Sequence, residues 1–145
     1  MSLFDKLQNA KNEKVQKEKD AGAAFLTENK TKEGVVELPN GIQYQVLKEG
    51  SGEKPKPTSN IKAHYRGALL NGQEFDSSFK RNQPFTARLT QLIKGWQEVL
   101  PLMPEGSMWR LWIPSNLAYG DNGAGANIPG GATLVFDIEL LEILS

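Results

Sequence analysis

Apolar side chains alternate with polar ones over much of the chain after residue 34, and this period of two is that of half-buried β-strands. In residues 42–46 and 61–66, every second side chain is apolar. Further strands are predicted at residues 85–89, 108–113 and 132–144, of which the last is the longest and the most continuously apolar. The repeated pattern predicts a sheet built from several strands.

Tight turns and a single helix complete this pattern. Asn71-Gly72 is a strong short-range signal for a β-hairpin, and Pro39-Asn40-Gly41 supplies another turn. Only one segment after residue 34 has apolar residues at helical steps of three and four, and Pro104-Glu105-Gly106 ends it. Its apolar residues are Ile93, Trp96, Val99, Leu100 and Met103. One short helix against several antiparallel strands predicts an α+β domain, with the helix covering one face of the sheet.

The first part of the chain has a different composition. Residues 5–20 are mostly Lys, Glu, Gln and Asn, with no proline, which predicts a polar helix. Residues 29–34 then form a linker. We therefore divide the chain into a helical arm with its linker, residues 1–33, and a folded domain, residues 34–145.

Two roles are open for this arm. It could be a partner or dimerisation element that uses Leu3, Phe4 and Leu7. Alternatively, it is a solvated helix that packs only through Phe25 and Leu26, and the absence of a convincing heptad pattern favours this second interpretation.

The charge balance argues against several classes of partner. The 17 basic and 17 acidic residues give a formal net charge of zero, so nothing attracts nucleic acid or an anionic membrane surface in general. No apolar run approaches the roughly 20 residues that span a bilayer, and the N-terminus lacks the apolar core of a signal peptide. We expect no nucleic-acid or membrane partner and a cytoplasmic location, with a periplasmic one as the alternative if a native leader was removed.

Few residues could support acid–base or metal chemistry. The chain has no cysteine and one histidine, which excludes thiol chemistry and a His-rich metal site, so no metal is expected. His64 is the one candidate base, but it points to the strand face opposite Tyr65, which favours a structural or solvent-facing role. Residues 120–125 are glycine-rich without opening an amphipathic helix, so we interpret them as a flexible flap rather than a phosphate loop.

Seven short motifs occur in a characteristic order along the predicted domain. They are His64-Tyr65-Arg66-Gly67, Phe75-Asp76-Ser77-Ser78, Pro84-Phe85, Leu92-Ile93-Lys94-Gly95-Trp96, Leu117-Ala118-Tyr119-Gly120, Ile128-Pro129 and Leu134-Val135-Phe136-Asp137. From about Gly34 to the C-terminus, the chain resembles the FKBP-type peptidyl-prolyl isomerases. It resembles in particular the bacterial macrophage-infectivity-potentiator-like group, in which a helical arm precedes a junction similar to residues 29–35. The arm of that group is much longer, so we expect a monomer rather than a dimer.

The resemblance implies a fold and a set of site residues. The fold is a curved antiparallel sheet wrapped around one short helix. The catalytic residues would be Tyr65, Asp76, Tyr119 and Phe136, and the substrate-binding residues Phe75, Arg81, Phe85, Leu92, Ile93, Trp96 and Ile128. Trp96 would form the pocket floor, and Tyr119 and the Ile93 N–H would donate to substrate carbonyls. Asp76 would lie at the rim, hydrogen-bonded to Tyr65 and paired with Arg81.

The reaction implied by the resemblance is rotation about an X-Pro amide bond. Its barrier is ~18–20 kcal/mol because the twisted amide loses its resonance. An apolar pocket lowers this barrier by removing water and by suiting the less polar twisted state, and it needs no cofactor and no nucleophile. The expected partners are proline-containing peptides, unfolded protein clients and the macrolide inhibitors tacrolimus and rapamycin.

Other classes of function remain open, and the sequence differs from its relatives at several positions near the pocket. A proline-peptide binding module or holdase, and a structural scaffold, are the other classes of function. Residues 124–127 stand where many relatives place a histidine, a proline or a second apolar residue, and Ala87 is smaller than the aromatic residue of eukaryotic relatives. Substrate preference at the rim is therefore left open.

Overall fold

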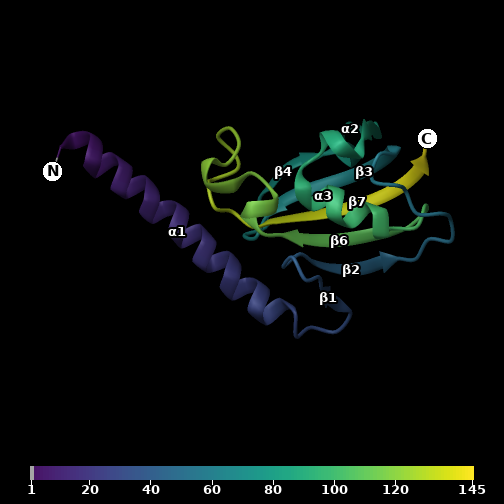
Figure 1. Cartoon of the computed structure of the whole chain (residues 1–145), viewed down its shortest axis with the longest axis horizontal. Coiled ribbons are helices and arrows are strands. Elements are labelled where there is room, and N and C mark those ends of the chain that lie inside the picture. The colour runs from purple at the N-terminus through teal and green to yellow at the C-terminus, as the bar shows by residue number, and fades with distance from the viewer. Residues whose placement is uncertain (1) are drawn as a thin grey trace.

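A computed structural model describes residues 2–145. A long helix, α1 (Leu3–Asn29), precedes a domain built on one antiparallel sheet of seven strands (Figure 1). The strands are β1 (Val35–Glu37), β2 (Gln43–Lys48), β3 (Asn60–Leu69), β4 (Glu74–Ser77), β5 (Phe85–Arg88), β6 (Met108–Ile113) and β7 (Leu134–Ile143). Their order in the sheet is β1-β2-β6-β7-β3-β4, and β5 pairs with β3 as well. The predicted α+β class is confirmed.

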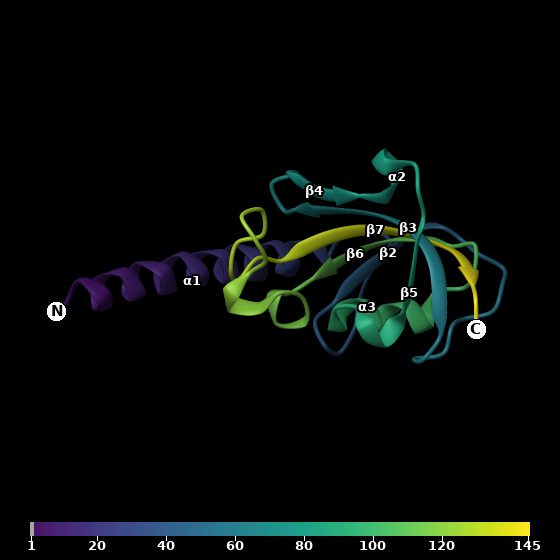
Figure 2. The same ribbon diagram turned by 90° about the horizontal axis from the view of Figure 1, so that it is seen from above.

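The two ten-residue strands, β3 and β7, form the centre of the sheet. They pair from Ile61 opposite Ile143 to Leu69 opposite Leu134, with a register shift near Lys62. The other edge of β3 is shared, since its first half pairs with β5 and its second half with β4. Figure 2 shows that the sheet is strongly curved, so that β4 and β5, which pair with different halves of β3, run in different directions.

The predicted helix is α3 (Lys94–Val99), and a 3₁₀ turn at Leu100–Leu102 continues it. It lies on one side of the sheet (Figure 2). Trp96, Val99 and Leu100 are buried there with apolar residues of β6 and β7. A Cβ on Gly95 would lie 2.5 Å from Ile113 Cγ2, so only glycine lets the helix begin this close to β6. This contact holds the start of α3 against β6.

Several short elements were not predicted. They include β1, with three residues, and α2 (Ser78–Arg81), with four, and neither is long enough to show a hydrophobic period. The hairpin predicted at Asn71-Gly72 joins β3 to β4, with Gly72 at a positive φ. Local capping defines α2, because the Ser77 hydroxyl accepts a hydrogen bond from the Lys80 N–H and Asn82 adopts the left-handed conformation.

The arm packs on the domain along one stripe of α1. The residues of the stripe are spaced by four, three, four and three: Val15, Lys19, Gly22, Leu26 and Asn29. A Cβ on Gly22 would lie 2.2 Å from the Thr133 hydroxyl oxygen, so the helix touches the start of the last strand. At its end, the buried Asn29 donates to Gln43 Oε1 over 2.9 Å. Phe25 and Leu26 are half-buried, as predicted, but they are not the only contacts of the arm, because Val15, Lys19, Gly22 and Asn29 are also shielded from solvent.

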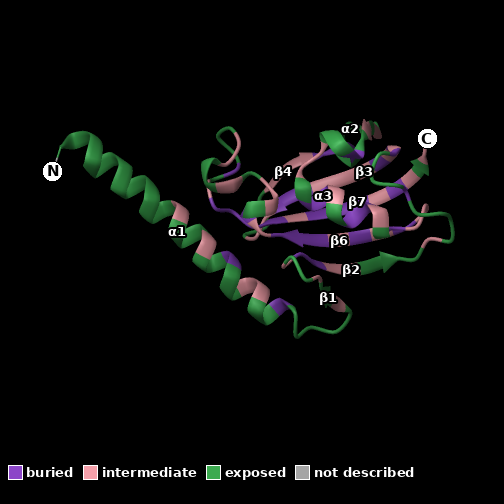
Figure 3. Ribbon diagram, in the orientation of Figure 1, coloured by how far each residue is buried: buried purple, intermediate pink, exposed green. Residues whose placement is uncertain are grey.

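The outer half of α1 projects away from the domain and is exposed on all sides (Figure 3). Leu3, Phe4 and Leu7 lie there, each more than 60% exposed. Although α1 is long, no helix of residues 2–145 is both long and apolar enough to cross a bilayer.

Candidate functional site

A cavity of about 140 Å³ opens between α3, the curved sheet and the loop before β7. Nine side chains line it, and all nine belong to the predicted site. They are Tyr65, Phe75, Asp76, Phe85, Leu92, Ile93, Trp96, Tyr119 and Phe136. Segments that are far apart in the sequence therefore converge on one pocket.

Aromatic rings form the floor and walls of this pocket. Trp96, which is 5% exposed, meets Tyr65, Phe85 and Phe136 with ring centroids 5.4, 5.7 and 5.3 Å away. The interplanar angles lie between 72° and 88°, and Phe75 contacts Phe136 in the same edge-to-face way. Edge-to-face contacts of this kind stabilise rings beyond the area they bury and fix their orientation. The result is a rigid apolar cup.

Gly67 of β3 allows two of these rings to lie against the sheet. A Cβ on this glycine would lie 2.7 Å from Phe75 Cζ and 2.8 Å from Phe136 Cε1. Its backbone φ is not positive, so the requirement for glycine is one of space.

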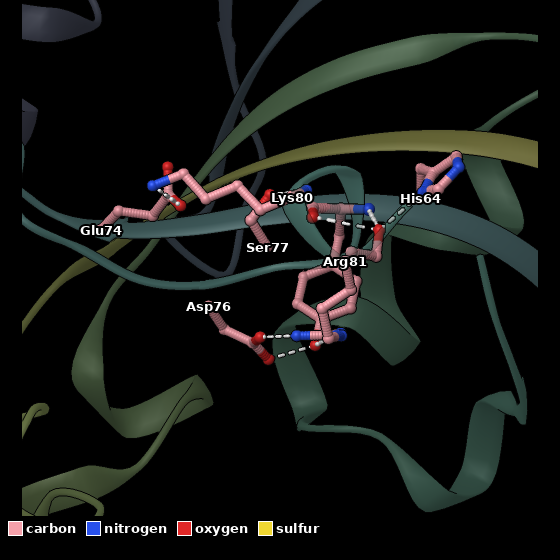
Figure 4. A network of polar contacts seen from close by, with 8 residues as sticks. His64, Glu74, Asp76, Ser77, Lys80 and Arg81 are labelled. Carbon is pink, nitrogen blue, oxygen red and sulfur yellow. Dashed lines mark hydrogen bonds and ion pairs between the residues drawn. The ribbon is translucent and has the colours of Figure 1, made fainter. Parts of the chain in front are cut away.

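One carboxylate stands at the rim of the cup. The Tyr65 hydroxyl donates to Asp76 Oδ2, and the Arg81 guanidinium pairs with Asp76 Oδ1 (Figure 4). Arg81 also donates to the Tyr65 hydroxyl oxygen over 3.3 Å. Partial burial disfavours the charge on Asp76, but the hydrogen bonds from Tyr65 and Arg81 and the positive charge of Arg81 outweigh it, so the pKa of Asp76 is lowered. Burial and the bond to Asp76 raise the pKa of Tyr65, so near neutral pH the carboxylate is ionised and the phenol protonated.

The position of Arg81 depends on Ser78, which the sequence analysis named in a motif but did not select as a site residue. Ser78 is fully buried at the start of α2, and its hydroxyl accepts a hydrogen bond from the Tyr65 N–H over 2.7 Å. This bond fixes α2 on β3 and places the Arg81 guanidinium carbon 5.8 Å from the centre of the Tyr65 ring. A serine at a helix start directly after a strand was the available signal.

His64 lies outside the pocket, as predicted from its place on the strand. Its ring stacks on Phe79 with centroids 4.7 Å apart. Its Nδ1 is 2.8 Å from the Ser78 hydroxyl, a contact drawn as a dashed line in Figure 4. Within residues 2–145, no group of three or more acidic or histidine side chains could hold a metal ion.

Two predicted site residues do not line the cavity. Arg81 acts on it only through Asp76 and Tyr65. Ile128 is 8% exposed and packs in the core, because mutual hydrogen bonds with Ala124 fold the preceding loop into a hairpin and turn this side chain inward. A role for Ile128 in substrate binding stays a prediction.

Two of the lining residues carry hydrogen-bond donors. Tyr119 lines it while remaining 39% exposed, so its side chain lies near the opening. Ile93 precedes the first residue of α3, and among residues 2–145 nothing accepts a hydrogen bond from its N–H. The arrangement can hold an apolar ring on Trp96 while it binds carbonyl groups at the edge.

Comparisons with known proteins agree with this geometry. The family model described as FKBP-type peptidyl-prolyl cis-trans isomerase matches residues 51–141, which is more than half of the chain. The chain belongs to the FKBP family. A second model, the domain amino terminal to FKBP-type isomerases, matches residues 1–46, which include the arm.

Individual FKBP relatives support the same assignment. The chain is 49% identical over 136 residues to the FKBP-type peptidyl-prolyl cis-trans isomerase FkpA of Aeromonas hydrophila, covering 90% of this chain and 50% of the relative. It is 42% identical over 132 residues to the outer membrane protein MIP of Legionella longbeachae, covering 91% and 57%. The crystal structure of FkpA from Escherichia coli superposes with a TM-score of 0.89 at 36% identity, covering 94% of this chain and 63% of that one. The predicted macrophage-infectivity-potentiator-like group is confirmed, and the chain spans about half to three-fifths of the length of these relatives.

Proposed function

We propose that this chain is a peptidyl-prolyl cis/trans isomerase that accelerates rotation about X-Pro bonds in peptides and in unfolded protein clients. The observation that carries the proposal is the aromatic cup with a single ionised carboxylate at its rim. Its shape suits a proline ring, and its chemistry suits a reaction in which no bond to the protein forms.

Desolvation supplies the first part of the mechanism. The proline ring packs on Trp96 between Tyr65, Phe85 and Phe136, and the amide that precedes it leaves water as it enters the cup. A planar amide is more polar than a twisted one, so loss of water raises the free energy of the planar state more than that of the transition state. Desolvation thereby lowers the free-energy difference between the bound planar amide and the twisted transition state.

Hydrogen bonding supplies the second part. The Ile93 N–H and the Tyr119 hydroxyl bind carbonyl groups on either side of the rotating bond and hold the chain ends while the carbonyl turns. Asp76, with its charge fixed by Tyr65 and Arg81, faces the path of that carbonyl. No group changes its protonation state.

The same pocket defines the expected ligands. The pipecolyl ring of tacrolimus or rapamycin mimics proline and would occupy the cup. Monomeric chains in the cytoplasm remain our expectation, and a periplasmic location is the alternative.

Two-dimensional exchange NMR tests the proposal directly. A peptide with an apolar residue before proline is measured with this protein at a few per cent of the peptide concentration. Catalysis speeds exchange at this ratio, whereas a binding module or holdase acts only at stoichiometric amounts. An unchanged exchange rate would refute the enzymatic function, and activity that survived saturating tacrolimus would refute the assignment of the pocket.

The pocket has a matched pair of variants for this assay. Phe136→Ala opens the cup to water and should abolish most of the acceleration, while Val36→Ala truncates an exposed apolar residue of β1 and should change nothing. Both variants are compared only when shown to be folded, because truncation of a large buried side chain can cost ~3–5 kcal/mol of stability.

A further inference from the structure

The arm contacts the loop that follows a pocket residue. Residues 120–131, here called the 120–131 loop, begin directly after Tyr119, which lines the cavity. A hydrogen bond of 2.9 Å from the Gly131 N–H to the Gly120 carbonyl oxygen closes the neck of the loop. Whatever fixes this neck also fixes the backbone beside Tyr119.

One side of the neck rests on α1. A Cβ on Gly131 would lie 2.6 Å from the Val15 carbonyl oxygen and 3.2 Å from Val15 Cγ1, and one on Gly130 would lie 3.1 Å from Val15 Cγ2. Gly131 also has a φ of +80°. Glycine is thus required at this point both by conformation and by the close approach of the helix.

An ion pair joins the same surfaces one turn further along the helix. Lys19 Nζ lies 2.7 Å from Asp121 Oδ1, with 40% and 63% of the two side chains exposed. Exposed pairs contribute little to global stability. The pair does, however, join α1 to the residue that follows Gly120 in the neck of the loop.

The loop depends on such support because its own backbone is permissive. Gly120, Gly123 and Gly125 all have positive φ, and glycine-rich backbone has many accessible conformations. The helix, in contrast, is fixed on the sheet by the contact of Gly22 with Thr133 and by the bond between Asn29 and Gln43. The fixed helix α1 therefore supports the conformationally free 120–131 loop beside the pocket.

We propose that Val15 and Lys19 of the arm are positioning residues, which hold the neck of the 120–131 loop so that the Tyr119 hydroxyl points at the substrate carbonyl. The inference rests on the proposed isomerase function and adds to it a role of the arm in the site. Neither residue touches the substrate, and both act through Tyr119.

A charge swap in the full chain tests the role of the ion pair. Lys19→Glu and Asp121→Lys should each lower kcat/KM in the exchange assay by about two- to five-fold, the range expected for an exposed pair. The double variant, which restores the pair with the charges exchanged, should recover the activity. Lys6→Glu makes the same charge change on the exposed outer part of α1 and serves as the control.

A double-mutant cycle asks whether Lys19 acts through Tyr119. In a Tyr119→Phe background, Lys19→Glu should cause no further loss, because the hydroxyl that it positions is already absent. Additive losses, or a double swap that stays as slow as the single variants, would overturn the proposal.

A spectroscopic measurement keeps the test independent of catalysis. The chain has three tyrosines, so 3-fluorotyrosine labelling gives three resonances, and Tyr119→Phe assigns that of Tyr119. Lys19→Glu and Val15→Ala should shift or broaden this resonance and leave Tyr44 and Tyr65 unchanged, and the charge swap should restore it in the Lys19 variant. An unmoved Tyr119 resonance in both variants would overturn the positioning role. A wild-type protein without activity but with these shifts would refute the isomerase function alone.

Discussion

The bond between Asn29 and Gln43 gives a sharp prediction about how the arm is attached. Gln43 is completely buried, and its amide has three partners: Asn29 Nδ2 donates to its oxygen, and its nitrogen donates to the Leu26 carbonyl and to Glu37. Asn29→Ala removes the donor and leaves the Gln43 oxygen buried without a partner. A buried acceptor left in this way costs about 1–3 kcal/mol.

Urea unfolding followed by tryptophan fluorescence measures this cost. Trp112 lies opposite Gln43 in the pairing of β2 with β6, so it reports on the same part of the sheet. Asn29→Asp should be at least as destabilising at pH 7, since it turns a carboxylate towards the Gln43 oxygen.

Asn12→Ala provides the matched control, because Asn12 is exposed on the same helix and accepts an exposed hydrogen bond from the Gln8 side chain. We expect this control to lie within about 0.5 kcal/mol of the wild type, as is usual for surface substitutions. If Asn29→Ala were equally mild, Gln43 would have found another donor, and the buried bond would not be what attaches the arm.

Three further predictions concern the pocket. The value of kcat/KM should be nearly constant from about pH 6 to 8, and His64→Gln should change it by less than about two-fold. A bell-shaped pH profile that vanished in this variant would instead make His64 a catalytic base. Because the pKa of Asp76 is lowered in the folded state, its carboxylate stabilises the fold above the unfolded-state pKa near 4, and this contribution is lost as pH falls through the folded-state pKa. In thermal melts, the stabilities of the wild type and Asp76→Asn should differ by at most about 1 kcal/mol at pH 7 and should converge in acid. A difference that widened in acid would contradict this prediction. Gly67→Ala should lower the free energy of unfolding in urea by about 1–3 kcal/mol, because the new Cβ must displace Phe75 and Phe136. The folded variant should also have a lower kcat/KM. Full activity would show that the two rings can move without harm to the pocket.

The sheet and the pocket could be predicted because their signals are local or ordered along the chain. The β6 strand occupies the predicted residues 108–113, where apolar side chains run up to Pro114. The nine lining residues come from motifs whose order is itself informative, although each aromatic residue alone would fit an ordinary core. The roles of these residues in catalysis remain predictions.

The attachment of the arm could not be predicted in the same way. Its contact stripe has heptad-like spacing but contains Lys19, Gly22 and Asn29, which no hydrophobic pattern selects. Glycine packs there because it is small, and asparagine because a buried glutamine lies opposite; both reasons exist only in the tertiary structure. The orientation of Ile128 likewise depends on a hairpin whose glycine conformations the sequence does not specify.

The projecting half of α1 also has a mechanical consequence. At 1.5 Å per residue, the helix is about 40 Å long, and the part before Val15 extends about 18 Å beyond the last support (Figure 1). A stiff rod held at one end is a lever, with the contact between Val15 and Gly131 as its fulcrum. A load on the apolar tip formed by Leu3, Phe4 and Leu7 would press on or release the neck of the 120–131 loop. Binding of a partner to these three side chains would therefore act on the cavity through the loop, without any contact with the cavity itself.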